Sequence, residues 1–144
     1  MRDAYLRTSY WVDTPHGAIR LRVGERNAAL DSVLSERSLT TWAFLTAYNP
    51  HSNPLSDAEN AERQRTFTVQ VTGFGFQTFT GRGIGDDGNW PAEESLLILG
   101  ITRETALTLA QTWEQNAFVH GVVGDVPELV WCSDDSLGET ITGT

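Results

Sequence analysis

The chain has 144 residues, the length of one domain, and its ten basic residues are all arginine because the sequence contains no lysine. Nineteen carboxylates give a formal net charge of −9, which excludes a non-specific nucleic-acid binder that neutralises phosphates. A hydrophobic content of 40% with five tryptophans excludes a disordered chain, and no apolar run approaches the roughly 20 residues that span a bilayer. We therefore expect a soluble, cytoplasmic protein without an internal disulfide, since Cys132 is the one cysteine.

The first third of the chain predicts a hairpin, a helix and a central strand. Residues 5–12 form an extended run, and residues 18–23 alternate apolar and polar side chains, which indicates a strand with one buried face. Turn residues lie between these two segments, so we expect a hairpin. Asn27 is a suitable N-cap for a helix through residue 35. Residues 41–48 are apolar without alternation, which predicts a central strand buried on both faces.

The clearest helix start is at Ser56. Pro50 ends the preceding strand, and a polar loop follows it. Ser56 stands three residues before Glu59, the capping-box spacing in which the serine accepts a first-turn amide and the glutamate reaches back. Two signals compete at the other end of this helix, because residues 66–71 alternate like a strand whereas Gly73 favours a helix stop.

The second half of the chain begins with two strand candidates and a helix. Residues 76–79 have the composition of a strand, and the glycines between 81 and 88 indicate a flexible turn or loop. Residues 96–99 form a second fully apolar strand. Thr102 caps a helix through about residue 114, whose apolar side chains recur at the spacing of a core-facing stripe.

The C-terminal part predicts one more hairpin, from residues 117–123 and 128–132. We expect the polar residues 133–144 to form a flexible tail, so the domain comprises residues 1–132. The predicted order is β-β-α-β-α-β-β-α-β-β. Hairpins without regular βαβ units indicate an α+β fold, with an antiparallel or mixed sheet and helices on one face.

Familiar catalytic and metal-binding motifs do not occur in the sequence. The glycines lack the Lys-Ser/Thr of a phosphate-binding loop, and there is neither an HExxH nor a Gly-x-Ser-x-Gly motif. His16, His51 and His120 are isolated, without the spacing of metal ligands. We therefore predict no metal and no cofactor, and the motifs assign no enzymatic reaction.

A polar cluster around Arg63 is the first candidate site. On a helix, Asn60 and Arg63 share the stripe of the apolar residues that should face the core. Free amides at the helix start and the arginine fork could together bind an anion. The loop and the helix start add three polar side chains, Asn49, Ser52 and Ser56. The structural alternative is an ion pair of Arg63 with Glu59 or with Glu94.

Glu94 and Ser95 form the second candidate site, because they stand where a buried strand begins. If Glu94 points inward, it is the only candidate general base, with Glu93 as its solvated neighbour. An inward Glu94 could equally be the buried partner of Arg63.

The third candidate lies at the end of the last helix, where Gln115 could contribute an amide. We expect its neighbour Asn116 to be a left-handed C-cap residue. Trp90 either fills the core beneath the glycine loop or forms an aromatic platform over a pocket. The candidate ligand-binding residues are Asn49, Ser52, Ser56, Asn60, Arg63, Glu94, Ser95 and Gln115.

Five short segments then carry a family resemblance. They are TAYNP at 46–50, LSDAEN at 55–60, GNWP at 88–91, LGI at 99–101 and QNA at 115–117. In this order, from about residue 5 to residue 130, they resemble a bacterial family known as domain of unknown function, family 3293, whose name implies no reaction. The resemblance implies a glycine at the position of Glu114 in many relatives. It also implies a shared pattern of polar residues: Asn49, Ser56, Glu59, Asn60, Arg63, Trp90, Glu94, Ser95 and Gln115.

Two functions are open at this stage. The first is a small domain whose polar pocket around Arg63 and Glu94 binds an anionic or nucleotide-like metabolite. The second follows from the charge distribution, since residues 1–82 hold nine arginines and eight acids, whereas residues 83–144 hold one arginine and eleven acids. The acidic part could lie against the arginines, or engage a basic partner protein as a regulatory or inhibitor protein would. The acids concerned are Asp125, Glu128, Asp134 and Asp135.

Overall fold

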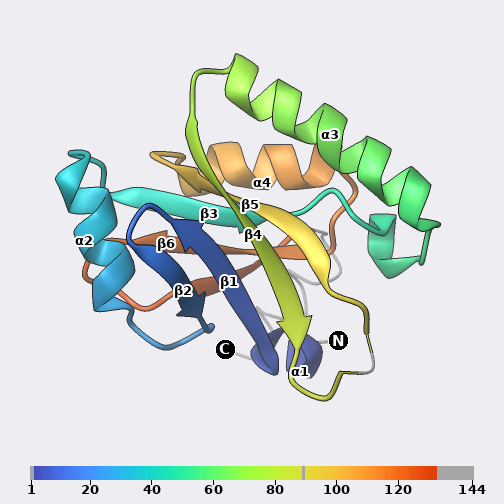
Figure 1. Ribbon diagram of the computed structural model, residues 1–144, viewed down its shortest axis with the longest axis horizontal. Coiled ribbons are helices and arrows are strands. Elements are labelled where there is room, and N and C mark those ends of the chain that lie inside the picture. Colours follow the sequence, from blue (N-terminus) through green and yellow to red (C-terminus); the bar gives the residue numbers. More distant parts are fainter. Residues whose placement is uncertain (1, 89, 133–144) are drawn as a thin grey trace.

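A computed structural model of the protein describes residues 2–88 and 90–132, and within them seven strands form one antiparallel sheet (Figure 1). The strand order across the sheet is β2-β1-β4-β5-β3-β6-β7. The strands are β1 (Thr8–Thr14), β2 (Gly17–Leu21), β3 (Thr41–Leu45), β4 (Gln77–Gly85), β5 (Glu93–Leu99), β6 (Ala117–Val122) and β7 (Glu128–Trp131). The helices are α1 (Arg2–Leu6), α2 (Ala28–Glu36), α3 (Asp57–Gly73) and α4 (Arg103–Thr112), with a short 3-10 helix, η1 (Pro50–Ser52).

The α+β class is confirmed, with a sheet that is antiparallel throughout its described pairs. None of the helices in the described part of the chain is long and apolar enough to cross a membrane. The tail predicted for residues 133–144 lies outside the described residues.

The order of the elements follows the sequence prediction apart from α1 and the short η1, neither of which was predicted. The last two residues of α1, 5 and 6, belong to the segment predicted as the first strand, which begins at Thr8 instead. The amide of Arg7 donates to Asp3 O at 2.9 Å, and the hydroxyl of Thr8 donates to Ala4 O at 2.6 Å. These local bonds satisfy the backbone ahead of β1, so the chain enters the sheet from a helical turn.

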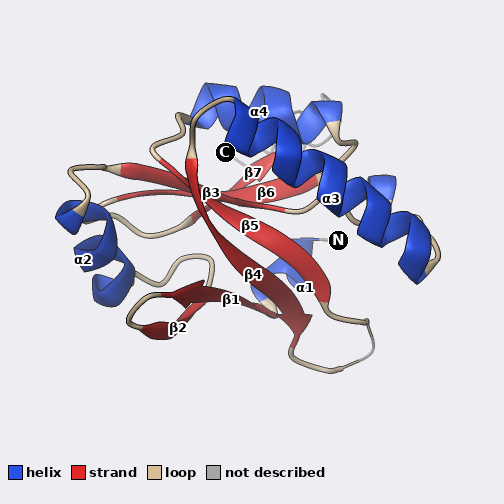
Figure 2. Cartoon of the chain, turned by 45° about the horizontal axis from the view of Figure 1, so that its top comes forward, coloured by secondary structure: helices blue, strands red, loops and turns tan. Residues whose placement is uncertain are grey.

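Different elements cover the two faces of the sheet. On the helical face, α3 and α4 lie side by side and pack on Leu45 and Ile98 (Figure 2). On the concave face, α2 and the curled β1–β2 hairpin pack on Phe44 and Leu97. Strand β3 lies between β5 and β6 and is buried on both faces, as predicted. The expectation that all helices share one face is wrong for α2, because Leu30 belongs to the core of the concave face.

Helix α3 begins and ends where its local signals predict. Ser56 Oγ accepts from Glu59 N at 3.1 Å, and Glu59 Oε1 accepts from Ser56 N at 3.2 Å, which confirms the capping box. The helix continues to Gly73, so the strand-like alternation in its second half forms no strand. Phe67 and Val71, four residues apart, are fully buried in the core, and this helical spacing outweighs the alternation.

Strand β4 contains the first three of the four glycines that the sequence predicted as a loop, and only Gly88 lies beyond it. Gly81, Gly83 and Gly85 occupy every second position, so all three lie on the concave face. An ideal Cβ on Gly81 would overlap the carbonyl oxygen of Trp11 and lie 3.0 Å from the Phe44 ring. Only glycine therefore permits this approach of β1. Hydrogen-bonded pairing with β1 on one side and β5 on the other keeps the glycine segment in the sheet despite its weak strand propensity.

We predict that Gly81→Ala lowers the free energy of unfolding by about 1–3 kcal/mol, because the new methyl group meets backbone that cannot move aside. The matched control is Gly83→Ala, on the same face of the same strand, where the nearest atom to an added Cβ is 3.7 Å away. This control should stay within about 1 kcal/mol of the parent. Urea unfolding of the three proteins measures the difference, and equal losses in both variants would contradict the packing argument.

Candidate functional site

The concave face encloses a cavity of about 660 Å³ at the end of the sheet away from α2. Five strands, β1, β3, β4, β5 and β6, supply its walls, and α1 and the loop after β3 complete it. Figure 1 shows α1 and α2 at separate ends of the sheet. At the α2 end, large side chains such as Trp42 and Leu97 fill the concave face. At the α1 end, the corresponding positions include Gly83 and Ser95, which leave the space open.

The glycine pattern of β4 creates this hollow. Gly83 is paired with Glu93 across β4 and β5, and Gly81 is paired with Ser95. Paired residues on neighbouring strands project from the same face of a sheet. Because the β4 partners are glycines, no β4 side chain covers Glu93 or Ser95 from the side.

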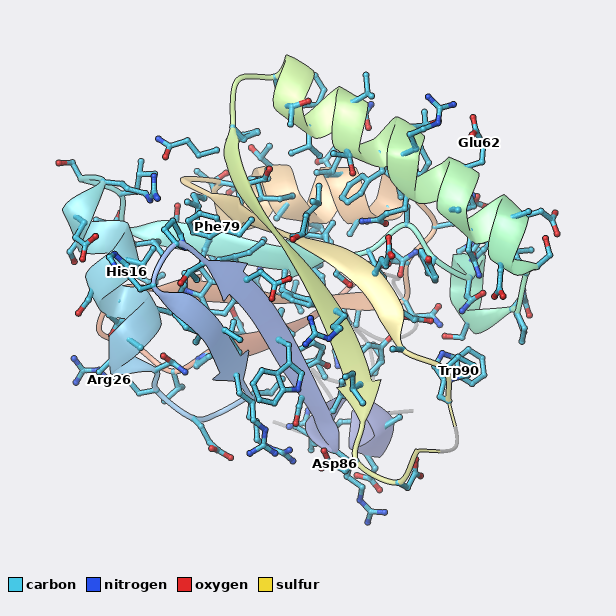
Figure 3. All side chains as sticks on the ribbon, in the orientation of Figure 1. His16, Arg26, Glu62, Phe79, Asp86 and Trp90 are labelled. Carbon is cyan, nitrogen blue, oxygen red and sulfur yellow. The ribbon has the colours of Figure 1, made fainter. Side chains whose placement is uncertain are left out.

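Glu93 supplies a carboxylate to the cavity. Its Oε2 atom accepts hydrogen bonds from Asn49 Nδ2 at 2.8 Å and from Trp90 Nε1 at 2.9 Å. Its Oε1 atom accepts none from the described residues. Trp90 lies in the connection between β4 and β5 and is 42% exposed, so it forms an aromatic edge of the cavity and not a core plug (Figure 3).

A chain of amides fixes the donor that Asn49 presents to Glu93. Asn49 Oδ1 accepts from Leu55 N at 3.0 Å and from Asn60 Nδ2 at 2.8 Å. Asn60 Oδ1 in turn accepts from the backbone amide of Asn49 at 2.9 Å. With its oxygen engaged in this way, Asn49 can direct only its Nδ2 group at the carboxylate. Asn60 is buried and acts behind the cavity, as a positioning residue for Asn49.

Helix α3 also fixes the backbone that leaves β3. Gln64 Oε1 accepts from Ala47 N at 2.9 Å, and Arg63 Nε donates to Ala47 O at 2.6 Å. Two side chains of one helix thus satisfy both backbone groups of a buried residue beyond the end of the strand. The loop that follows starts from a fixed position at the edge of the cavity.

Arg63 has a structural set of partners. Its Nη2 donates to Trp113 O at 2.8 Å, its Nη1 pairs with Glu114 Oε1 at 3.3 Å, and its guanidinium lies 5.5 Å from the centre of the Trp113 ring. Arg63 pairs with neither Glu59 nor Glu94, the partners predicted from sequence, and it does not line the cavity. It joins α3, the end of β3 and the end of α4.

The loop beside the cavity has an unusual backbone. Asn49, His51 and Ser52 have φ angles of 47°, 52° and 62°, a region that residues other than glycine rarely adopt. Two contacts hold the loop: His51 N donates to Glu114 O at 2.6 Å, and Asn116 Nδ2 donates to Ser52 Oγ at 2.8 Å. The left-handed residue after α4 is Glu114, with φ 60°, and not Asn116 as predicted. This conformation suits the glycine that the family resemblance implies there.

The structure brings together half of the residues predicted for the site. Asn49, Ser52, Ser95 and Gln115 line the cavity, whereas Ser56, Asn60, Arg63 and Glu94 do not. Glu94 is exposed on the opposite side of β5, since successive strand residues point to opposite faces. Sequence reasoning treated Glu93 as a solvated neighbour and missed it. Alternation counted back from buried Ser95 would have identified it.

All three tyrosines of the chain line the cavity as well, and sequence reasoning missed them. The pKa of Tyr5 is raised to about 12, first by burial and then by the charge of Glu93, while a hydrogen bond with Ser52 opposes the rise. The pKa values of Tyr10 and Tyr48 are raised too, mainly by burial, and Glu93 contributes to both. The cavity therefore keeps its phenols protonated.

The acidic C-terminal half is partly paired with arginines. Arg22 Nη2 lies 2.9 Å from Asp86 Oδ2, a contact between the basic and acidic halves. Glu128, one of the acids considered for a basic partner protein, pairs with Arg103, with 3.0 Å between Arg103 Nε and Glu128 Oε1. Two more of those acids lie outside the described residues, Asp134 and Asp135.

Two other reactive groups, Cys132 and His120, do not line the cavity. Burial raises the pKa of the Cys132 thiol to about 12, so this thiol is not a thiolate at neutral pH. Burial also lowers the pKa of His120, whose Nε2 lies 3.2 Å from Ile101 O. Across residues 2–88 and 90–132, no three His, Cys, Asp or Glu side chains gather as metal ligands. The cavity offers one oriented carboxylate in an aromatic setting, an arrangement suited to binding.

These features define a class of protein, an α+β domain with a ligand-sized cavity inside a curled antiparallel sheet. The family model described as protein of unknown function (DUF3293) matches residues 45–118, which is half of the chain, and the chain belongs to this family. No curated protein and no solved structure matches the chain. The matched segment contains Asn49, Trp90, Glu93 and Gln115, while β1 and α1 supply lining residues from outside it.

We predict that Arg63→Lys lowers the free energy of unfolding by about 1.5–3 kcal/mol. The guanidinium of Arg63 contacts two carbonyls and a carboxylate through three separate nitrogens, and the single ammonium of lysine cannot replace all three contacts. Arg65→Lys is the matched control on the same helix, since Arg65 is exposed and, among the described residues, its guanidinium pairs with Glu62 alone. Chemical unfolding should show the loss in the first variant alone. If Arg63→Lys unfolds at the denaturant concentration of the parent, Arg63 does not tie the layers together.

The raised tyrosine pKa values predict a loss of stability at alkaline pH. In the unfolded chain the phenols ionise near the ordinary value of about 10. In the folded protein they hold their protons to higher pH, so their stabilising contribution is complete below pH ~10 and declines as the pH rises toward 12. Ultraviolet difference spectra against pH should show delayed tyrosinate formation, and Tyr5→Phe should weaken the dependence. If the tyrosines of the folded protein ionise near the ordinary tyrosine pKa, this prediction is contradicted.

Proposed function

We propose that the protein is a small-molecule binding domain whose ligand occupies the cavity of the concave face. The observation that carries the proposal is the oriented carboxylate of Glu93, held on one oxygen by Asn49 and Trp90 inside a cavity of about 660 Å³. Cavities of this volume, with aromatic walls and few fixed polar groups, are typical of small-molecule sites.

The strain of the neighbouring loop supports the proposal. Three left-handed residues within four positions cost free energy that the fold would avoid if the loop only connected β3 to α3. The strained backbone instead places Asn49 and Ser52 at the cavity, where the first orients Glu93 and the second contacts Tyr5. Prior orientation of polar groups reduces the entropy that a ligand loses on binding.

The proposal differs from the sequence-based hypothesis in its anchor. That hypothesis assigned an anionic or nucleotide-like ligand to Arg63, which is engaged with Ala47, Trp113 and Glu114. Glu93, and not Arg63 or Glu94, is therefore the residue on which binding should depend. The alternative of a basic partner protein gains no support from Glu128, because Arg103 already pairs with it.

We predict that filling the hollow opposite Glu93 abolishes binding. Gly83→Val projects an isopropyl group into the cavity, where an added Cβ meets only ordinary contacts. Arg82→Val is the matched control, because it places the same side chain on the other face of β4. In a thermal-shift screen of small aromatic amines, alcohols and carboxylates, hits should raise Tm for the parent and for Arg82→Val only.

Two results would count against a binding cavity. One is a set of hits that stabilise Gly83→Val as much as the parent, which would place binding elsewhere. The other is a complete absence of hits for a parent protein that folds and unfolds cooperatively. A ligand present at a concentration of a hundred times its Kd raises the free energy of unfolding by about 2.7 kcal/mol. A weak ligand therefore remains detectable at high concentration.

A further inference from the structure

We infer that the cavity selects an organic cation, a protonated amine that carries an apolar group. This inference rests on the proposed function and names the chemical class of its ligand. Three features of the described residues lead to it: the balance of charge on the cavity wall, the acceptor that Glu93 leaves available, and the aromatic rings around it.

The charge on the wall is negative. Within the described part of the chain, four charged side chains line the cavity: the acids Asp3, Asp87 and Glu93 and the base Arg7. Among the described residues, no arginine or histidine forms an ion pair with Glu93. Its hydrogen-bond donors, an amide and an indole, are neutral, so they orient the carboxylate without neutralising it. A partly buried carboxylate of this kind favours a ligand that brings the counter-charge.

The hydrogen bonding of Glu93 selects a donor. Oε2 already accepts two hydrogen bonds, whereas Oε1 accepts none from the described residues. A carboxylate oxygen has two acceptor sites, so Oε1 can take an N–H group from a ligand. An ammonium donor gives a charge-assisted bond, which is stronger than one from a neutral hydroxyl. An anion offers no donor and would meet the charge of Glu93 directly.

The rings around Glu93 suit the same ligand. Six aromatic residues line the cavity among those that the structure describes: Tyr5, Tyr10, Phe44, Tyr48, Trp90 and Phe118. The negative face of an aromatic ring attracts a cation, and cages of several rings recognise substituted ammonium groups. The charge of Glu93 raises the pKa of all three tyrosines, so the negative potential of this carboxylate extends to the rings of the cavity. The apolar part of the ligand would pack on the rings.

The test uses three probes of matched size and different charge: 3-phenylpropylamine, 3-phenylpropanol and 3-phenylpropionate. Isothermal titration of the parent at neutral pH should give the amine an affinity roughly tenfold or more above that of the alcohol, with the carboxylate weakest. Raising the salt concentration should reduce the preference for the amine only partly, because the pair between the ligand ammonium and the Glu93 carboxylate lies within the cavity.

Two isosteric variants then locate the charge that matters. Glu93→Gln keeps an oxygen for Asn49 and Trp90 but removes the charge, so the preference for the amine should fall to less than about threefold while the alcohol binds as before. Glu94→Gln, the adjacent residue on the exposed side of β5, should retain the full preference.

The outcomes separate the inference from the proposed function. If all three probes bind the parent equally and Gly83→Val prevents binding, the cavity binds ligands and the cation preference is overturned. If the amine still binds Gly83→Val, it is attracted to the acidic surface and the inference is overturned. If no probe binds the parent, both proposals fail. The order of the three probes on the parent decides the inference even if Glu93→Gln does not fold.

Discussion

The absence of a side chain at Gly81 permits the close approach of the β1 backbone to β4 within the curled sheet. A Cβ at this position would overlap the backbone of Trp11, so no movement of a flexible side chain could make room for it. The curl creates the concave face, and the next glycine on that face, Gly83, leaves it empty beside Glu93. The alternation of glycines in β4 therefore permits both the close approach of β1 and the open volume beside Glu93.

Helix α3 connects this sheet to the polar side of the cavity. It packs on the helical face through Phe67 and Val71, and its first turns project Asn60, Arg63 and Gln64 toward the chain beyond β3. These three side chains bond backbone that has left the ladder of the sheet and lacks strand partners there. The loop can then hold a strained conformation, because the helix supplies the bonds that a regular element would otherwise make.

Local signals predicted the elements better than they predicted the site. The caps at Ser56 and Thr102 identified two helices, since capping depends on neighbours within four residues. The prediction of a loop over residues 81–85 is wrong, because the strand there depends on pairing with β1 and β5. The choice between Glu93 and Glu94 depends on which face of β5 each side chain occupies. Alternation along the strand assigns these faces only when the burial of one nearby residue is already known. Residues whose position depends on contacts distant in the sequence could therefore be assigned only from the three-dimensional structure.

The pairing of β1 with β4 has a consequence for how the protein is made. Val12 meets Gly81 across a connection that includes α2, β3 and the longest described helix, α3. During synthesis the β1–β2 hairpin emerges before the glycine strand β4 and has no sheet to join until that strand follows. Its apolar side chains, among them Tyr10 and Leu21, stay unburied on the nascent chain through that interval. We therefore expect closure of the curl to be a late folding step that is slowed by loop-closure entropy, with the hairpin as the segment most exposed to chaperones.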